Sequence, residues 1–447
     1  MWLLILLGLA IVFIVVSTTR FKLHPFLALL LAAFAYGVAS GKMSLADVAA
    51  AVNTGFGNTV GAIGIVILAG SIIGTFLEKS GGAYSLAEST IRVVGQKNVP
   101  LAMGLIGYIV GIPVFCDSGF VVLSPLAKAM SRRAGMPLAA SAIALSLGLY
   151  ATHTMVPPTP GPIAAAGILQ ADLGLVILWG LLVSLVALAT GWLFALIMTR
   201  HAPADSAVAD PVPTDPVVDA RRPSALMSVV PILLPIVLIV LKSIADLPEH
   251  PLGKGGGAQL AGFVGQPVVA LLIGVFLAFL LPAKRTTEML STTGWVGEAV
   301  LAAATIIIIT GCGGAFGQVL RGSGIADLIT TYVGDREGLS ILLPFVVAAA
   351  LKTAQGSSTV AIITTAGIMA PLLESLHLDS PTGRALAVVT IGAGSMVVSH
   401  VNDSYFWVVT GFSKMTIKDG YRLQTLGTFV EGCAAAVTLW AIAGFAL

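Results

Sequence analysis

The chain has little charge. Only 10% of its 447 residues are Asp, Glu, Lys or Arg, and 57% are hydrophobic, whereas a soluble domain carries about 25% charged residues. This composition excludes an ordinary soluble enzyme and predicts an all-α integral membrane protein with many helices. The formal net charge of +2 provides no basic surface for a nucleic-acid partner.

Cysteine is scarce as well. Cys116, Cys312 and Cys433 show no metal-ligand spacing, and three cysteines cannot all pair. We therefore expect no metal site and no cofactor. The apolar start, Met1 to Val16, lacks the basic segment and cleavage site of a signal peptide, so it is interpreted as a first membrane span.

Proline, by contrast, is concentrated in one apolar stretch. Pro157, Pro158, Pro160 and Pro162 fall within six positions of the segment 137–170. They remove amide donors and interrupt a helix, and backbone freed in this way at membrane depth is tolerated only inside protein or beside a water-filled cavity. The segment therefore predicts a broken transmembrane helix. Its polar residues are candidates for binding: His153, Thr154 and Thr159, with Pro158 beside them.

The same order of segments occurs twice along the chain. We expect residues 1–200 and 225–447 to form two repeats, joined by a disordered cytoplasmic linker at 201–224. Each repeat has about five crossings, one re-entrant hairpin (99–131 and 339–373) and one broken helix (137–170 and 384–412). An odd number of crossings would invert the second repeat relative to the first.

The basic residues agree with this topology, because cytoplasmic loops carry an excess of Lys and Arg. With both termini outside, most basic loops lie on the cytoplasmic side, including those at Arg20, Arg132, Arg200, Lys284 and Lys414. Inverted repeats with discontinuous helices are typical of secondary transporters, whose sites lie at the midplane.

Four polar elements would meet at that midplane, namely the two hairpin tips and the two helix breaks. The candidate substrate-binding residues are Asp117, Ser118, Gly119, His153, Thr154, Pro158, Thr159, Lys352, Gln355, Gly356, Ser357, Ser358, Thr359, His400, Asn402 and Asp403. Helix N-termini carry free amides and partial positive charge. Gln355 to Thr359, which opens the second arm of its hairpin, is therefore the leading candidate to bind a carboxylate.

Ionisable residues at membrane depth are costly and usually functional. Asp117, Asp403, His153 and His400 are the candidates to carry a proton. Lys352 could face the substrate carboxylate, or it could pair with Asp117 or Asp403. An Asp–Lys ion pair that never titrates is a further alternative.

Taken together, these motifs resemble the gluconate permease family of bacterial proton symporters, over nearly the whole chain. The matching stretches are Arg20 to Lys22, Asp117 to Phe120 with Pro125, His153, Pro157-Pro158, Pro160 to Pro162, Gly314 to Leu320, Gly356 to Ala361 and Ser399 to Asp403. The resemblance implies a multi-pass protein of the bacterial inner membrane, usually a homodimer, that moves by an elevator mechanism.

The resemblance also implies a substrate class: gluconate and related aldonates, glycerate-like acids, or D-serine. Gluconate-type members more often carry glutamate, histidine and arginine where this chain has Asp117, Thr159 and Lys352, which favours a shorter acid. We expect proton-coupled import of a small hydroxymonocarboxylate. The alternatives are a sodium-coupled carrier of dicarboxylates or other organic acids, a D-serine or hydroxybutyrate permease, a passive channel and an intramembrane hydrolase.

Overall fold

A computed structural model describes residues 2–95, 98–200, 222–245, 255–325, 340–400 and 403–447, which form helices and short connections. Most of the predicted linker, and Asn402, lie outside these residues. The first half comprises α1 (Trp2–Thr19), α2 (Pro25–Ser40), α3 (Leu45–Lys79), α4 (Gly82–Val94), α5 (Val99–Gly111), α6 (Cys116–Ala134), α7 (Leu138–Met155), α8 (Pro160–Leu169) and α9 (Leu173–Thr199). The second half comprises α10 (Ala225–Ala245), α11 (Gly256–Val264), α12 (Pro267–Ala278), η2 (Thr287–Leu290), α13 (Trp295–Gly322), α15 (Leu342–Gln355), α16 (Ser358–Met369), η4 (Ala370–Leu372), α17 (Pro381–Met396), α18 (Ser404–Phe412), α19 (Ile417–Gly420), η5 (Tyr421–Thr425) and α20 (Leu426–Ala446).

The long helix α3 spans two segments that the sequence predicts to be separate. An interfacial arm from Lys42 to Gly57 and a span from Thr59 to Leu77 are expected, but α3 takes in both, with a 43° bend between Leu45–Ala62 and Gly64–Lys79. Ser44 begins the helix with a capping box to Asp47, which satisfies the first free amides. No proline follows to end it, so the helix continues.

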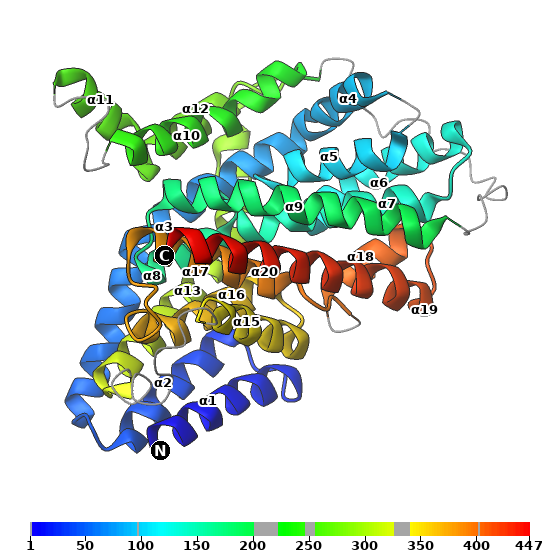
Figure 1. Ribbon diagram of the computed structural model, residues 1–447. Helices are drawn as coiled ribbons and strands as arrows, with labels where there is room; N and C mark the ends of the chain where they lie inside the picture. Colours follow the sequence, from blue (N-terminus) through cyan, green and yellow to red (C-terminus); the bar gives the residue numbers. More distant parts are fainter. Residues whose placement is uncertain (1, 96–97, 201–221, 246–254, 326–339, 401–402) are drawn as a thin grey trace.

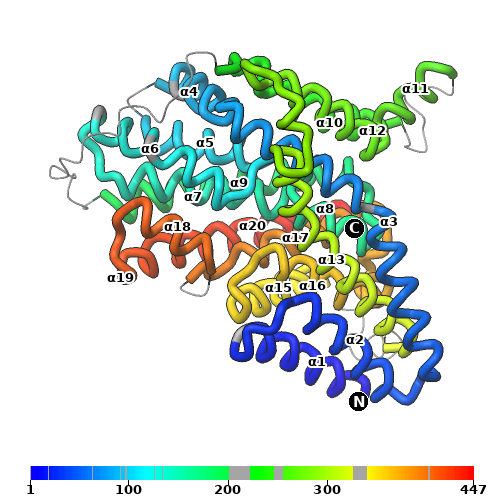
Figure 2. Tube along the Cα trace, turned by 180° about the vertical axis from the view of Figure 1, so that it is seen from behind, coloured from blue at the N-terminus to red at the C-terminus, as the bar shows by residue number. Residues whose placement is uncertain are grey.

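Helix α13 packs along α3 because small residues line the contact. The Gly311 to Gly317 segment superficially suggests a nucleotide-binding loop, yet here it lies inside α13. A Cβ at Gly314 would collide with Thr59 of α3, and one at Gly317 would lie 2.9 Å from the Gly367 carbonyl of α16. Close helix packing therefore explains these glycines. Figure 2 shows α13 running beside α3, with α16 behind it.

The helices that position the site occur in the same order in both halves. α5 and α6 form a helical pair over the first predicted hairpin, and α15 and α16 form one over the second. Each pair is followed by a broken helix, α7–α8 in one half and α17–α18 in the other. α17 begins at Pro381 rather than at Arg384 because Ser380 caps it and proline suits the first turn.

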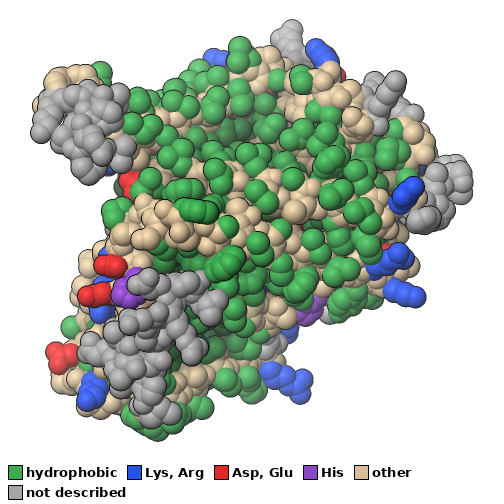
Figure 3. Space-filling model, in the orientation of Figure 1, with side chains coloured by type: hydrophobic (Ala, Val, Ile, Leu, Met, Phe, Trp, Pro, Cys, Tyr) green, Lys and Arg blue, Asp and Glu red, His purple; other side chains and the backbone are tan. Residues whose placement is uncertain are grey.

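The surface is that of a protein surrounded by lipid. Hydrophobic side chains cover most of the face in Figure 3, and charged side chains gather near its edges. Among the described residues, five helices or broken helices are long and apolar enough to cross a membrane. The number rises to seven if each of two bent helix pairs counts as one span. The expected total of about ten crossings stays a prediction.

Candidate functional site

The break between α7 and α8 lies at the centre of the molecule. Every residue from Ala151 to Pro162 is buried. Thr159 Oγ1 donates to the Val156 carbonyl at 2.7 Å, so this hydroxyl satisfies a carbonyl that the interrupted helix leaves free. Glycines of three other helices contact the backbone of the break: Gly70 of α3 at Pro158, Gly180 of α9 at Met155, and Gly392 of α17 at Thr154. The break is thus enclosed by protein backbone.

The tip between α15 and α16 is shaped by Gly356. Its φ of 82° lies in the left-handed region, which glycine adopts without steric cost. This turn ends α15 and places Ser357 as the N-cap of α16, where its Oγ accepts from the Val360 amide at 3.3 Å. The amides of the first turn of α16 therefore point out of the tip, as helix N-termini require.

A buried ion pair ties this tip to the second broken helix. Lys352 is fully buried, and its Nζ lies 2.6 Å from Asp403 Oδ2 and 2.8 Å from the Gly356 carbonyl oxygen. Asp403 Oδ2 also accepts from Ser399 Oγ at 2.5 Å, and Oδ1 accepts from the Tyr405 amide at 3.1 Å. Asp403 is therefore the N-cap of α18 as well as the partner of Lys352.

Asp117 is held less firmly, in the first turn of α6. Its Oδ1 accepts from Ser404 Oγ at 3.3 Å, and Cys116 Sγ lies 3.7 Å from Oδ2. Among the described residues no cation pairs with it. The two aspartates of the site thus differ in their surroundings, because Lys352 faces one of them and not the other.

A cavity of about 250 Å³ opens where the hairpin tips and the helix breaks meet. It is lined by Phe115, Cys116, Asp117, His153, Gln355, Gly356, Ser357, Ser358, Thr359, Asp403, Ser404 and Tyr405. Ligand pockets for drug-sized molecules measure about 300–1,000 Å³, so this cavity suits a smaller molecule. Its walls are mostly polar, which is unusual at the centre of a membrane protein and indicates a binding site.

Two residues of the cavity wall carry buried polar atoms without a hydrogen-bond partner among the described residues. They are Gln355, at both Nε2 and Oε1, and His153, at Nδ1. Buried polar groups are normally hydrogen-bonded. The Gln355 amide offers a donor and an acceptor together, which a hydroxyl group of a ligand could satisfy both at once.

The predicted site residues divide into two groups by their position. Those that line the cavity are Asp117, His153, Gln355, Gly356, Ser357, Ser358, Thr359 and Asp403. Lys352 lies behind the wall, paired with Asp403, and His400 Nε2 lies 2.8 Å from the Thr353 carbonyl oxygen. Thr154 and Thr159 bond to backbone carbonyls. Ser118, Gly119 and Pro158 are not part of the wall either, so these seven residues support the site rather than line it.

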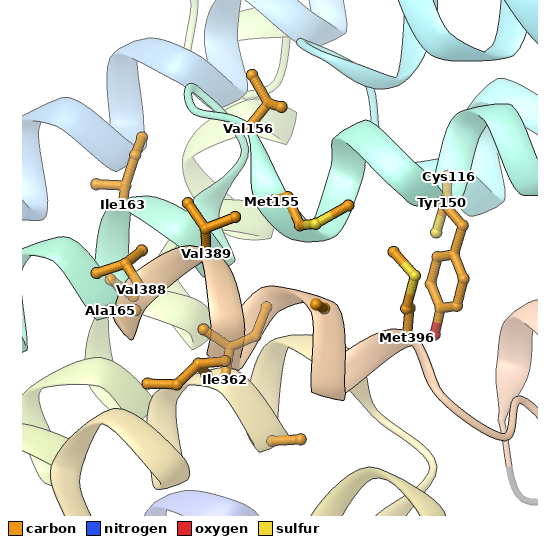
Figure 4. Packing of buried hydrophobic residues seen from close by; sticks show 14 of the residues in the cluster. Cys116, Tyr150, Met155, Val156, Ile163, Ala165, Ile362, Val388, Val389 and Met396 are labelled. Atoms are coloured by element: carbon orange, nitrogen blue, oxygen red, sulfur yellow. The ribbon is translucent and has the colours of Figure 1, made fainter. Parts of the chain in front are cut away.

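Two tyrosines and two polar residues of this region are absent from the predicted site. Tyr405 lines the cavity, and Tyr150 bonds to Ser358 Oγ at 2.9 Å. Figure 4 shows Tyr150 and Cys116 close together beside Met396. Tyrosines in apolar helices give no pattern that separates a cavity wall from packing. The other two are Gln424 and Glu431, beside and within the last predicted span. Polar and ionisable residues are rare in such spans and usually functional, so the sequence alone could have singled them out.

Close relatives transport small polar acids. The chain is 35% identical to the gluconate permease of Pseudomonas aeruginosa over 419 residues, covering 93% of this chain and 92% of that protein. It is 35% identical to the D-serine transporter DsdX of Escherichia coli K12 over 441 residues, covering 97% and 96%. The Gnt-II system L-idonate transporter of the same organism is 32% identical over 430 residues, covering 95% of each chain.

Solved structures share the fold at low sequence identity. The YdaH transporter of Alcanivorax borkumensis superposes with a TM-score of 0.69 at 18% identity, over 95% of this chain and 99% of that one. The efflux pump MtrF of Neisseria gonorrhoeae gives 0.65 at 14% identity, over 96% of each chain. The expected helical transporter architecture is thereby confirmed at the level of the fold.

The family model described as GntP family permease matches residues 2–445. Transport proteins at this similarity exclude the hydrolase alternative. The chain belongs to the GntP permease family, and it is an integral membrane transport protein, not an enzyme.

Proposed function

We propose that this permease imports a small hydroxymonocarboxylate by proton symport across the bacterial inner membrane. The observation that carries the proposal is the cavity wall, where the Gln355 amide, which has no partner in the described part of the chain, adjoins the N-terminus of α16. An anion and a hydroxyl group are what these two features bind best. Gluconate, L-idonate and D-serine, for which the relatives are named, each combine a carboxylate with hydroxyl groups.

The carboxylate would bind at the first turn of α16. Ser357 Oγ already accepts from Val360, so its proton remains available to donate to an anion. Ser358 Oγ is shared with Tyr150, which holds it at the cavity wall. Lys352 is not free to bind the substrate directly, because Asp403 and the Gly356 carbonyl occupy its ammonium. The substrate's charge would therefore be met by helix amides and hydroxyls.

Asp117 is the better of the two aspartates to carry the proton. It faces the cavity, and no cation among the described residues holds it ionised. Asp403 is already held in an ion pair with Lys352 and accepts a hydrogen bond from Ser399. An anion entering beside a charged Asp117 would be repelled, so protonation of Asp117 would allow it to bind. This links uptake of the proton to uptake of the acid.

An amino acid such as D-serine is a second candidate because of the same residue. Asp117, left charged, lies in the cavity wall with the N-terminus of α16. The two would suit the ammonium and the carboxylate of a zwitterion. In that case proton coupling would need another group.

The transport movement belongs to the proposal as well. Two hairpins and two broken helices in the same order support a carrier built from two repeats. In the proposed mechanism the repeats are inverted, the cavity moves across the membrane as an elevator, and the protein is a homodimer. Reaction of Thr359→Cys with an impermeant reagent from each side in turn tests the movement. Light scattering in detergent tests the dimer, and a monomer would contradict it.

Uptake into proteoliposomes tests the function. We expect the purified chain to accumulate at least one of gluconate, glycerate, hydroxybutyrate or D-serine under an inward proton gradient, without sodium. Accumulation that requires sodium would overturn proton coupling, and uptake that only equilibrates would indicate a channel. D-serine and glycerate differ chiefly in the ammonium group. A preference for D-serine would therefore identify a zwitterionic amino acid as the substrate.

A further inference from the structure

A second buried acid lies outside the cavity, in α20. Glu431 is fully buried, and neither of its carboxyl oxygens has a hydrogen-bond partner among the described residues. It lies against α9, where Gly191 leaves room for it: a Cβ there would lie 3.1 Å from Glu431 Oε1 and 3.0 Å from Leu147 Cβ. Any larger residue at Gly191 would press on the carboxyl.

Such a carboxyl is stable only in its neutral form. Burying an unpaired charge costs far more than burying the acid, and no ion pair among the described residues reaches Glu431. The helices packed against α20 bring few titratable side chains. α9 has none, and the others are Tyr150 and His153 on α7, Arg384 on α17, Lys352 on α15, Tyr421 and Arg422 on η5, and Cys433 on α20 itself. Tyr405 of α18 also lies within electrostatic range of Glu431. These surroundings therefore favour the protonated form of Glu431 in the conformation described here.

A chain of polar contacts leads from the cavity to the segment just before this helix. Tyr405, in the cavity wall, donates from its hydroxyl to the Ser146 carbonyl at 3.0 Å. Ser146 Oγ donates to Gln424 Oε1 at 2.8 Å. Gln424 is fully buried, its Nε2 has no partner among the described residues, and it lies in the π-helical segment η5 just before α20.

The π-helical segment is a further indication of function. Such segments are rare and are frequently found at functional sites. Gln424 and Glu431 are seven residues apart, which places them near the same face of the helix. An unpaired amide donor and an unpaired acid thus lie along one face, behind the wall of the cavity.

We propose that Glu431 is a second proton-binding site of this permease, separate from the substrate cavity. Its carboxyl would release the proton to the cytoplasm before the empty carrier returns and take one up from the outer side before the next inward step. The proton is the only species transferred, and the group alternates between acid and carboxylate. The coupling role rests on the proposed symport, whereas proton binding at Glu431 does not.

Infrared spectroscopy of the purified full chain tests proton binding directly. At neutral pH we expect a carboxylic-acid C=O band that shifts in D₂O, disappears in Glu431→Gln and moves in Glu431→Asp. Glu374→Gln, the same change at an exposed acid, should leave the band unchanged. If Glu431→Gln fails to fold, the band's shift in Glu431→Asp decides. A band that neither variant alters would overturn the proposal.

Transport in proteoliposomes then tests the role in coupling. With radiolabelled gluconate, or D-serine if that is the transported acid, Glu431→Gln should retain exchange between internal and external substrate. It should lose at least ten-fold in accumulation driven by a proton gradient. Undiminished accumulation would overturn the coupling role. If the wild-type protein itself takes up no proton with substrate, the proposed symport fails, while the infrared result still stands for Glu431.

Discussion

At the scale of single residues, the two aspartates of the cavity should behave differently. Asp117→Asn removes the proposed proton-binding group without removing an ion pair. We therefore expect it to abolish accumulation driven by a proton gradient and to leave substrate exchange partly intact, because exchange needs only movement of the loaded carrier. Counterflow and pH-driven uptake in the same proteoliposomes measure the two activities. Full accumulation by this variant would show that another residue, His153 or Glu431, carries the proton.

The Lys352–Asp403 pair makes a prediction about stability. Removing one partner of a buried pair leaves an uncompensated charge and typically costs about 3–5 kcal/mol. We expect Lys352→Met and Asp403→Asn each to unfold at lower temperature than the wild type, and the double variant to recover much of that loss. Thermal unfolding in detergent measures it. Equal and additive losses would mean that the 2.6 Å contact contributes little.

At the scale of elements, the enclosure of the helix break depends on glycines of its neighbours. A Cβ at Gly392 would collide with the Thr154 carbonyl, next to His153 in the cavity wall. Overpacking of this kind costs about 1–3 kcal/mol. Gly392→Ala should therefore lower the unfolding temperature and weaken substrate affinity together, measured by thermal shift with and without substrate.

A matched control lies in α18, the other half of the broken helix that carries Gly392. Gly411 of α18 has no atom within 4 Å of a Cβ built on it. Gly411→Ala should be neutral or slightly stabilising, since alanine favours a helix by up to about 1 kcal/mol over glycine. If both substitutions behave alike, close packing against the break is not what Gly392 provides.

At the scale of the whole molecule, the proposed inversion of the two repeats makes a prediction about sidedness. Basic loops assign the linker to the cytoplasm and the segment near Gly256, at the start of α11, to the outside. A cysteine introduced at Ala209 should react with an impermeant reagent only from the cytoplasmic side, and one at Gly256 only from outside. Labelling of right-side-out and inverted vesicles measures this. Reaction of both from one side would contradict the inverted arrangement.

Local sequence was enough to place the elements that form the site. Prolines after Val156 must interrupt a helix wherever they lie, and a serine before a helix tends to cap it. The breaks at α7–α8 and α17–α18, and the turn at Gly356, follow from such rules between near neighbours in the chain. The transporter class follows in turn, because helices broken at membrane depth need a polar cavity.

Only the tertiary structure decided which polar groups face one another. Lys352 could have paired with Asp117 or Asp403, and the choice of Asp403 depends on how α15 packs against α17 and the break after it. Packing between other helices puts His400 and Thr159 behind the cavity wall and leaves Glu431 against Gly191, without a partner among the described residues. Pairing energy depends on distances of a few ångströms between helices far apart in sequence. No pattern along the chain contains those distances.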